Sequence, residues 1–348
     1  MIIPFFIPHA GCPQQCVFCN QKNIIGRKIS EDVATLSAKI NRYLSTNTSG
    51  KPVQFAFYGG TFTALPLEEQ KVYLETVRPF LRTGQIGTIR LSTRPDCISP
   101  EGLRLLAEFH VTIVELGVQS LDDRVLSLSN RGHTAADAEK AVTMLRQHGL
   151  SVGIQLMPGL PGDGSHRFEQ TVEKTVGLKP DFVRLYPALV IKDTPLEELY
   201  RKGRFTPLTL TEAVSLCRKA YVKFEQNAIA VIRMGLQPTE ELEKPGTILA
   251  GPYHPAFRQL VESSLFLDAM RAALVITGGE SRTAVFRIHP RDVSTAIGQR
   301  RENIETLKKE FGLQDVLFVE DGKISTRGKP VLVSGFKEEP KTVTEGRT

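Results

Sequence analysis

Three cysteines stand close together near the start of the chain, spaced as Cys12-x3-Cys16-x2-Cys19. This spacing places three thiols on one short loop. Thiolates are the protein ligands of iron–sulfur clusters, and three of them can bind three irons of a [4Fe-4S] cube. The fourth iron then has no protein ligand. The chemistry that the pattern favours is therefore reaction at an open iron.

Two other interpretations of the triplet stay open. A structural zinc site needs four ligands and would recruit His9. A disulfide framework needs paired cysteines and an oxidising compartment. The chain has five cysteines, an odd number, and the other two, Cys97 and Cys217, are far apart in sequence. We expect those two to be small core residues, so the count favours metal ligation in a reducing compartment.

An aromatic residue, Phe18, stands just before the last cysteine of the triplet. A cluster that binds S-adenosylmethionine at its open iron needs such a residue to pack on the nucleoside. The triplet together with Phe18 resembles the signature of the radical S-adenosylmethionine superfamily. The resemblance implies a partial (β/α)6 TIM-like barrel with the cluster loop after its first strand. It also implies two cofactors, a [4Fe-4S] cluster and S-adenosylmethionine.

The same resemblance implies a reaction. A reductant such as flavodoxin or ferredoxin supplies one electron, the sulfonium is split, and a 5'-deoxyadenosyl radical removes a hydrogen from a substrate inside the barrel. The protein positions the radical and excludes water.

The composition is that of an ordinary soluble globular protein. The 348 residues are 41% hydrophobic and 24% charged, enough for one large domain and a small one. No apolar run reaches the length of a membrane span, and residues 1–8 lack the basic segment and cleavage site of a signal peptide. We therefore expect a cytoplasmic protein without a membrane partner. The net charge of +6 suits a polyanionic partner.

Short apolar segments alternate with amphipathic ones through the first two thirds of the chain. This alternation predicts an α/β fold with a parallel sheet and helices outside it. Six such units would make an open barrel. The expected strands are residues 3–7, 52–58, 88–92, 112–117, 152–157 and 182–186, and the expected helices are residues 28–44, 67–81, 100–109, 135–148 and 167–177.

Polar or glycine-rich residues follow each expected strand, where a barrel of this kind gathers its functional side chains. Gly59, Gly60 and Thr61 resemble the family motif that holds the amino group of S-adenosylmethionine. The planar fork of Arg131 can pair with its carboxylate. The candidate cofactor-binding residues are Phe18, Gly59, Gly60, Thr61, Thr93, Arg94, Gln119 and Arg131. The candidate catalytic residues are Gln119, Arg131, and Tyr253 and His254 on a loop flanked by glycine and proline.

Several segments in order sharpen the resemblance. Residues 117–120, 130–134, 157–162 and 179–187 are similar to the radical domain of the catalytic subunit of Elongator, which modifies wobble uridines in tRNA. The similarity covers roughly residues 1–240. That family usually has a wider gap between its first two cysteines and carries an acetyltransferase domain. No glycine loop of the acetyl-CoA type follows residue 240, so we expect a radical domain without that partner domain.

After the barrel we expect a helical connector at 241–275 that packs on it, a small α+β domain at 276–332 and a disordered tail at 333–348. A basic loop with one glycine lies between two expected helices, at 290–297 and 302–311, with strands on either side. It resembles the backbone-clamping loop of a KH-type RNA-binding module. The candidate RNA-binding residues are Gly298, Gln299, Arg300 and Arg301.

These observations predict a radical S-adenosylmethionine enzyme, possibly a tRNA-modifying transferase. Two alternatives are a radical enzyme acting on a small molecule such as a porphyrin precursor, and a zinc-stabilised RNA-binding protein without catalysis. The identity of the substrate atom, the fate of S-adenosylmethionine and the oligomeric state do not follow from the sequence.

Overall fold

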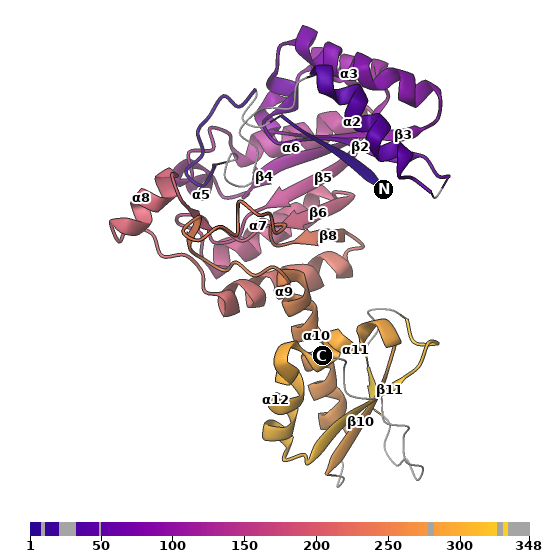
Figure 1. Cartoon of the computed structure of the whole chain (residues 1–348). Coiled ribbons are helices and arrows are strands. Elements are labelled where there is room, and N and C mark those ends of the chain that lie inside the picture. The colour runs from indigo at the N-terminus through magenta and orange to yellow at the C-terminus, as the bar shows by residue number, and fades with distance from the viewer. Residues whose placement is uncertain (8–10, 21–32, 49, 278–281, 326–329, 333–348) are drawn as a thin grey trace. The chain divides into compact units, whose positions relative to one another are not determined.

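A computed structural model of the chain describes residues 1–7, 11–20, 33–48, 50–277, 282–325 and 330–332. His9, the first part of the helix expected at 28–44 and the tail at 333–348 lie outside these residues. The chain divides into two compact units, Met1–Pro255 and Ala256–Thr348 (Figure 1).

The first unit is built on one sheet whose neighbouring strands are all parallel. The strands follow one another in the sheet in the same order as in the sequence. This order, with curvature, is that of a partial TIM-like barrel, so the predicted fold class is confirmed. A seventh strand adds to the six expected. The strands are β1 (Ile2–Phe6), β2 (Val53–Tyr58), β3 (Ile86–Thr93), β4 (Val111–Gln119), β5 (Ser151–Leu156), β6 (Phe182–Leu185) and β8 (Ala230–Met234).

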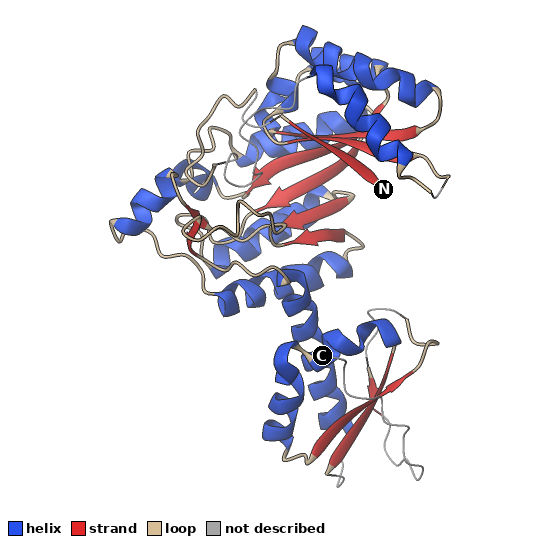
Figure 2. Cartoon of the chain, in the orientation of Figure 1, coloured by secondary structure: helices blue, strands red, loops and turns tan. Residues whose placement is uncertain are grey.

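Helices connect the strands (Figure 2). Crossovers between parallel strands are almost always right-handed, so a sequential strand order puts the connecting helices on one face of the sheet. The other face is then left to line the inside of the open barrel. The helices are α2 (Val33–Ser45), α3 (Leu67–Arg82), α4 (Pro100–Glu108), α5 (Asp123–Leu128), α6 (Ala135–Gln147), α7 (Ser165–Leu178), α8 (Pro195–Arg201) and α9 (Leu210–Gln226).

The strands alternate between apolar and polar side chains. Alternate residues of a strand point to opposite faces of the sheet, so each strand presents an apolar row to the helices and a polar row to the inside. The apolar row forms the core and is almost fully buried. Its members include Phe55, Phe57, Ile89, Leu91, Val114, Leu116, Val152, Ile154, Val183 and Leu185.

Several short elements of this unit were not expected from the sequence. The helices α5 and α8 are short, and the strands β7 (Val190–Ile191) and β9 (Ile248–Ala250) form a separate antiparallel pair. A strand of two or three residues is too short to show a period in the sequence. These elements lie in the segments that follow the strands, and α8 and the loop after α5 contact the cysteine loop.

The second unit is a small α+β domain with its own core. It runs through α10 (Phe257–Thr277), β10 (Thr283–Ile288), α11 (Val293–Ile297), α12 (Glu302–Phe311), β11 (Asp315–Glu320) and β12 (Val331–Leu332). Strand β10 lies between β11, to which it is parallel, and β12, to which it is antiparallel. Helices and strands bury one apolar cluster that includes Phe266, Met270, Phe286, Ile304 and Leu307.

The boundary between the units falls between Pro255 and Ala256. The connector expected at 241–275 is therefore divided: its first part belongs to the barrel unit, and α10 contributes Phe266 and Met270 to the core of the second unit. Within the described residues, no helix is long and apolar enough to cross a membrane.

Candidate active site

The cysteine loop, residues 11–20, is fastened by backbone contacts from two later segments of the barrel unit. The amide of Val17 donates to the carbonyl of Ser129 (3.1 Å), and the Asn130 side chain donates to the carbonyl of Gln15 (2.8 Å). The Leu196 amide donates in turn to the Val17 carbonyl (2.8 Å). The loop after α5 and the start of α8 therefore fix the position of the triplet.

A glycine lets the loop approach the end of β2 closely. Gly11 has φ +69°, and a Cβ at this position would lie 2.4 Å from the carbonyl oxygen of Thr61. The next residue of the loop also contacts Thr61: the Cys12 sulfur lies 3.2 Å from the Thr61 hydroxyl. Gly59 and Gly60, just before Thr61, also have positive φ values. The strand end and the loop can meet this closely only because position 11 is a glycine.

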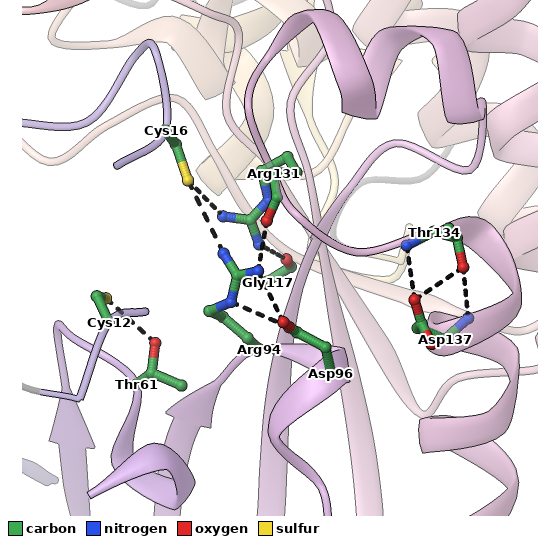
Figure 3. A network of polar contacts seen from close by, with 9 residues as sticks. All are labelled: Cys12, Cys16, Thr61, Arg94, Asp96, Gly117, Arg131, Thr134 and Asp137. Atoms are coloured by element: carbon green, nitrogen blue, oxygen red, sulfur yellow. Dashed lines mark hydrogen bonds and ion pairs between the residues drawn. The ribbon is translucent and has the colours of Figure 1, made fainter. Parts of the chain in front are cut away.

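The sulfur of Cys16 faces two guanidinium groups (Figure 3). Nη1 of Arg131 donates to Cys16 Sγ at 3.0 Å, and Nη1 of Arg94 lies 4.0 Å from the same atom. Asp96 holds Arg94 in bidentate fashion, through bonds of 3.0 and 2.9 Å. Burial alone would lower the pKa of Arg94, but the hydrogen bond and the charge of Asp96 outweigh burial and raise it. Both arginines are therefore fixed cations beside the loop.

Arg131 is held by backbone as well as by Cys16. Its Nη2 donates to the carbonyl of Gly117, and its own carbonyl accepts a hydrogen bond from Arg94. Thr134 ends this loop by capping α6, with reciprocal hydrogen bonds to Asp137 (Figure 3). Such a capping box fixes where the helix begins and therefore where Arg131 lies.

The structure brings most of the predicted cofactor residues to one end of the sheet. Thr93 is the last residue of β3, and its hydroxyl lies 2.6 Å from that of Thr63. Gln119 ends β4 with φ +68° and accepts a hydrogen bond from Gln155 (3.2 Å). Phe18 packs against two apolar clusters, one that includes Val190 and Leu196 and one that includes Val125, Leu160 and Ala188.

His133 is the most unusual polar residue of this region. It is 5% exposed, and neither ring nitrogen has a hydrogen-bond partner of normal geometry, although the Val118 backbone lies near. Burial, and then the nearby Arg131 guanidinium, lower the pKa of His133 to about 4. The imidazole is therefore neutral at pH 7, and it supports the loop that carries Arg131.

The donor set fits an anionic group bound beside the loop. Arg131 is 5% exposed and its Nε has no hydrogen-bond partner in the described part of the chain, so a buried donor is directed at this region without an acceptor. Among the described residues, no three His, Cys, Asp or Glu side chains come together around a point suited to a single metal ion. A cubane places each thiolate on a different iron, so its three ligands stand farther apart than those of one ion.

Two predicted sites lie elsewhere. Tyr253 donates to Glu243 (2.8 Å) and packs against Leu189, Ile191 and Leu242. Burial, together with Glu243, raises the pKa of Tyr253 to about 12. These contacts do not test the catalytic role expected for Tyr253 and its neighbour His254, and that role stays a prediction. Residues 298–301 belong to the second unit.

Sequence reasoning gave no role to two residues of this region. Cys97 was expected in the core. Burial raises the pKa of its thiol to about 11, and Arg94 and Cys12 lie near enough to interact with it electrostatically. Asp163, after β5, lines a cavity of about 470 Å³ with Leu160 and Arg204. Burial raises the pKa of Asp163 to about 7, and its Oδ1 has no partner among the described residues.

Fold and site together define an α/β partial-barrel protein with a thiol-rich loop at the carboxyl ends of its strands. Residues 6–175 match the radical SAM superfamily, and residues 180–266 match the radical SAM C-terminal domain. The chain belongs to the radical SAM superfamily. Membership implies S-adenosylmethionine and an iron–sulfur cluster as cofactors.

Curated relatives are similar to the chain over its first part. An uncharacterized protein of Methanocaldococcus jannaschii is 30% identical over 220 residues, which are 59% of this chain and 66% of that protein. The tRNA uridine(34) acetyltransferase of Methanocaldococcus infernus is 33% identical over 249 residues, 60% of this chain and 46% of that enzyme. The enzyme of the same name from Dehalococcoides mccartyi is 30% identical, with 56% and 50% covered. The chain thus spans about half the length of these two acetyltransferases.

A solved structure shows the same fold. The archaeal Methanocaldococcus infernus Elp3, with residues 1–46 deleted, superposes with a TM-score of 0.58 at 23% identity. The match covers 76% of this chain and 62% of that one. The partial barrel is therefore a fold that this chain shares with an Elongator-type protein.

Replacing Gly11 by alanine should impair the loading of the cluster. The new Cβ would meet the Thr61 carbonyl at 2.4 Å, whereas at Gly84, with a similar φ of +71°, nothing lies within 4 Å. Both alanines should cost about 1 kcal/mol of stability through the left-handed backbone. Only Gly11→Ala should lower the iron and sulfide bound per chain after anaerobic reconstitution. Equal iron contents in Gly11→Ala and Gly84→Ala would contradict this.

The stability of the apo protein should depend on pH through His133. Its pKa of about 4 in the folded chain lies below the unfolded value near 6.5, so the unfolded chain binds the proton first. The free energy of unfolding should therefore fall as the pH drops from about 6.5 to 4, by about 2 kcal/mol between pH 7 and pH 5. Urea titrations at these two pH values measure it.

His133→Gln should remove this part of the pH dependence. His148→Gln, which changes an exposed histidine on the same helix–loop unit, should keep it. A wild-type pH dependence equal to that of His133→Gln would refute the assignment.

Proposed function

We propose that the chain is a radical S-adenosylmethionine enzyme in which Cys12, Cys16 and Cys19 hold a [4Fe-4S] cluster, and that its substrate is tRNA. When bound, the cluster supplies the electron that splits S-adenosylmethionine into methionine and a 5'-deoxyadenosyl radical. The observation that carries the proposal is the pair of guanidinium groups at Cys16. A cluster with three thiolates is an anion, and fixed cations beside it stabilise that charge.

The residues of the barrel mouth then have separate tasks. Arg131, with its unpartnered Nε, is placed to pair with the carboxylate of S-adenosylmethionine, and the glycines before Thr61 let the ligand's amino group approach the backbone. Phe18 packs into the apolar wall beside the last cysteine, where it can support the nucleoside. Asp96 keeps Arg94 in place. A reductant such as flavodoxin or ferredoxin, present in a cytoplasmic setting, would supply the electron.

Two observations support RNA as the substrate. Two of the relatives to which the chain is similar are tRNA uridine(34) acetyltransferases. In the second unit, strand, helix, loop, helix and strand follow one another from β10 to β11, and this is the order in which a KH module holds its backbone-clamping loop. The loop of residues 298–301 joins α11 to α12, which is where the sequence predicted an RNA contact.

The geometry of this loop suits a phosphate backbone. Arg300 and Arg301 are exposed and have φ values of +50° and +63°, so the chain turns sharply and presents both side chains to solvent. Gly298 lies against Asn303, whose buried amide donates to Ser263 and Ala296 and fixes the crossing of the helices. Exposed arginines on a rigid turn are typical of contacts to phosphate.

Cys16→Ala should abolish both the cluster and its reaction. Anaerobic reconstitution of the wild type should give absorption in the visible, with iron and sulfide in equal amounts, and reduction should release 5'-deoxyadenosine from S-adenosylmethionine. Cys217→Ala, in the core of α9, should retain both. A Cys16→Ala protein that keeps cluster and product would rule out the assignment, and one zinc without sulfide would favour the non-catalytic alternative.

Changing Arg300 and Arg301 to alanine should weaken tRNA binding in a gel shift at low salt. Loss of two phosphate contacts should also reduce the slope of log affinity against log salt by about 1.4 for single-stranded RNA. The control is Arg104→Ala with Arg201→Ala, two exposed arginines of the barrel unit, which removes the same charge. If both double variants bind alike, the loop is not the clamp, and if the wild type does not bind, a small-molecule substrate is favoured.

A further inference from the structure

An ion-pair network lies on the inner face of the sheet, away from the apolar core. Glu115 of β4 accepts from Arg90 of β3 at 2.7 Å and from Arg184 of β6 at 2.9 Å, and its second oxygen lies 2.6 Å from Nε of Arg184. Glu115 and Arg90 are 5% and 8% exposed. Strands β3 and β6 thus each direct a guanidinium group at one carboxylate of β4 inside the open barrel.

This network is not what stability alone would select. Removing ions from water costs several kcal/mol for each, and replacing a buried ion pair by apolar side chains is often neutral or stabilising. The interior of a TIM-type barrel is ordinarily filled with branched apolar residues. Here two guanidinium groups share one carboxylate, so the network keeps an excess positive charge.

Two tyrosines extend the network toward the barrel mouth. Nη1 of Arg184 donates to the hydroxyl of Tyr186 at 3.1 Å, and Nη2 donates to the hydroxyl of Tyr58 at 3.3 Å. Because each hydroxyl oxygen accepts, each hydroxyl proton is available for another acceptor. In the part of the chain that the structure describes, neither hydroxyl donates to a protein acceptor. Both side chains are partly exposed.

The two hydroxyls lie on the same face as the cysteine loop contacts. Tyr58 is the last residue of β2, directly before Gly59, and Tyr186 directly follows β6. Glu115 shares its face of β4 with Gly117, whose carbonyl accepts from Arg131. At about 3.3 Å per residue, Glu115 lies roughly 7 Å below Gly117 along the strand. A group bound by the tyrosines would therefore lie just inside the barrel, below the cluster loop.

We propose that Tyr58 and Tyr186, oriented by Arg184, bind acceptor oxygens of the substrate and so position it for hydrogen abstraction. Among the described side chains of this network, the groups left for a ligand are donors, because arginines contact both oxygens of Glu115. The group that it takes is therefore rich in oxygen acceptors, and pyrimidine carbonyls and phosphate oxygens of RNA both have this chemistry. The inference rests on the proposed function for the reaction, but the binding of the acceptor group can be tested without the cofactors.

The test uses Tyr58→Phe, Tyr186→Phe and the double variant, which remove the hydroxyls and keep the rings. Tyr200→Phe, on the exposed side of α8, is the control. In the reconstituted enzyme, tRNA-stimulated release of 5'-deoxyadenosine should fall about tenfold for each lost hydroxyl. The iron bound per chain should match that of Tyr200→Phe, because the cysteine loop is unaltered. The affinity for tRNA in a gel shift should fall less than this rate, because the second unit is unaltered.

A second readout needs no cofactor. In the apo protein, high concentrations of either uridine or inorganic phosphate should raise the melting temperature of the wild type and of Tyr200→Phe, and this shift should be lost in the double variant. The compound that gives the shift identifies the acceptor as a base carbonyl or as a phosphate. A double variant that keeps both the shift and the tRNA-stimulated rate would overturn the inference. If 5'-deoxyadenosine is absent even in the wild type, the proposed reaction fails, and the melting shift still decides the binding site.

Discussion

The contact between the Arg131 guanidinium and the Cys16 sulfur is the interaction on which the site depends. It joins the loop after α5 to the loop after β1, two segments that are distant in sequence. Arg131 can make it because Gly117 and Arg94 bind its side chain and its carbonyl, and because the cap at Thr134 fixes the next helix. A buried cation of this kind is costly unless anionic partners compensate it. The arrangement is therefore most stable when an anionic group occupies the mouth of the barrel.

The hydrophobic periodicity of the sequence was sufficient to predict most strands and helices of the barrel. It was insufficient to predict which side chains meet inside the barrel. The strands from β2 to β6 were predicted because each has an apolar row and is followed by a helix, and the polar ends of β3 and β4 did bring Thr93 and Gln119 to one edge. The pairing of Glu115 with Arg184 could not be predicted, since it depends on which strands curve toward each other. Glu115 and Arg184 are some seventy residues apart in sequence. The local sequence of neither strand indicates that the two side chains meet in the folded chain.

The fastening of the cysteine loop was missed for a related reason. The bonds from Ser129, Asn130 and Leu196 run largely through backbone groups, and backbone groups have no sequence signature. Gly11 is the exception, because a glycine directly before a cysteine triplet can be noticed without a structure. Its function becomes clear only when the Thr61 carbonyl is seen at the position that a Cβ would need. The structure thus shows that position 11 needs a glycine because a side chain there would meet the Thr61 carbonyl.

The two units point to a division between affinity and positioning. Exposed arginines on the turn at 300–301 can gain binding energy from any phosphate backbone, and that energy is uniform along the chain of a nucleic acid. Hydrogen abstraction needs one C–H bond held near the radical, and uniform attraction cannot select it. Directional donors such as the hydroxyls of Tyr58 and Tyr186 can, because a hydrogen bond weakens steeply when its geometry is lost. Fixed donors inside the barrel and exposed cations on the turn of the second unit would therefore serve two successive requirements of one reaction, capture and alignment.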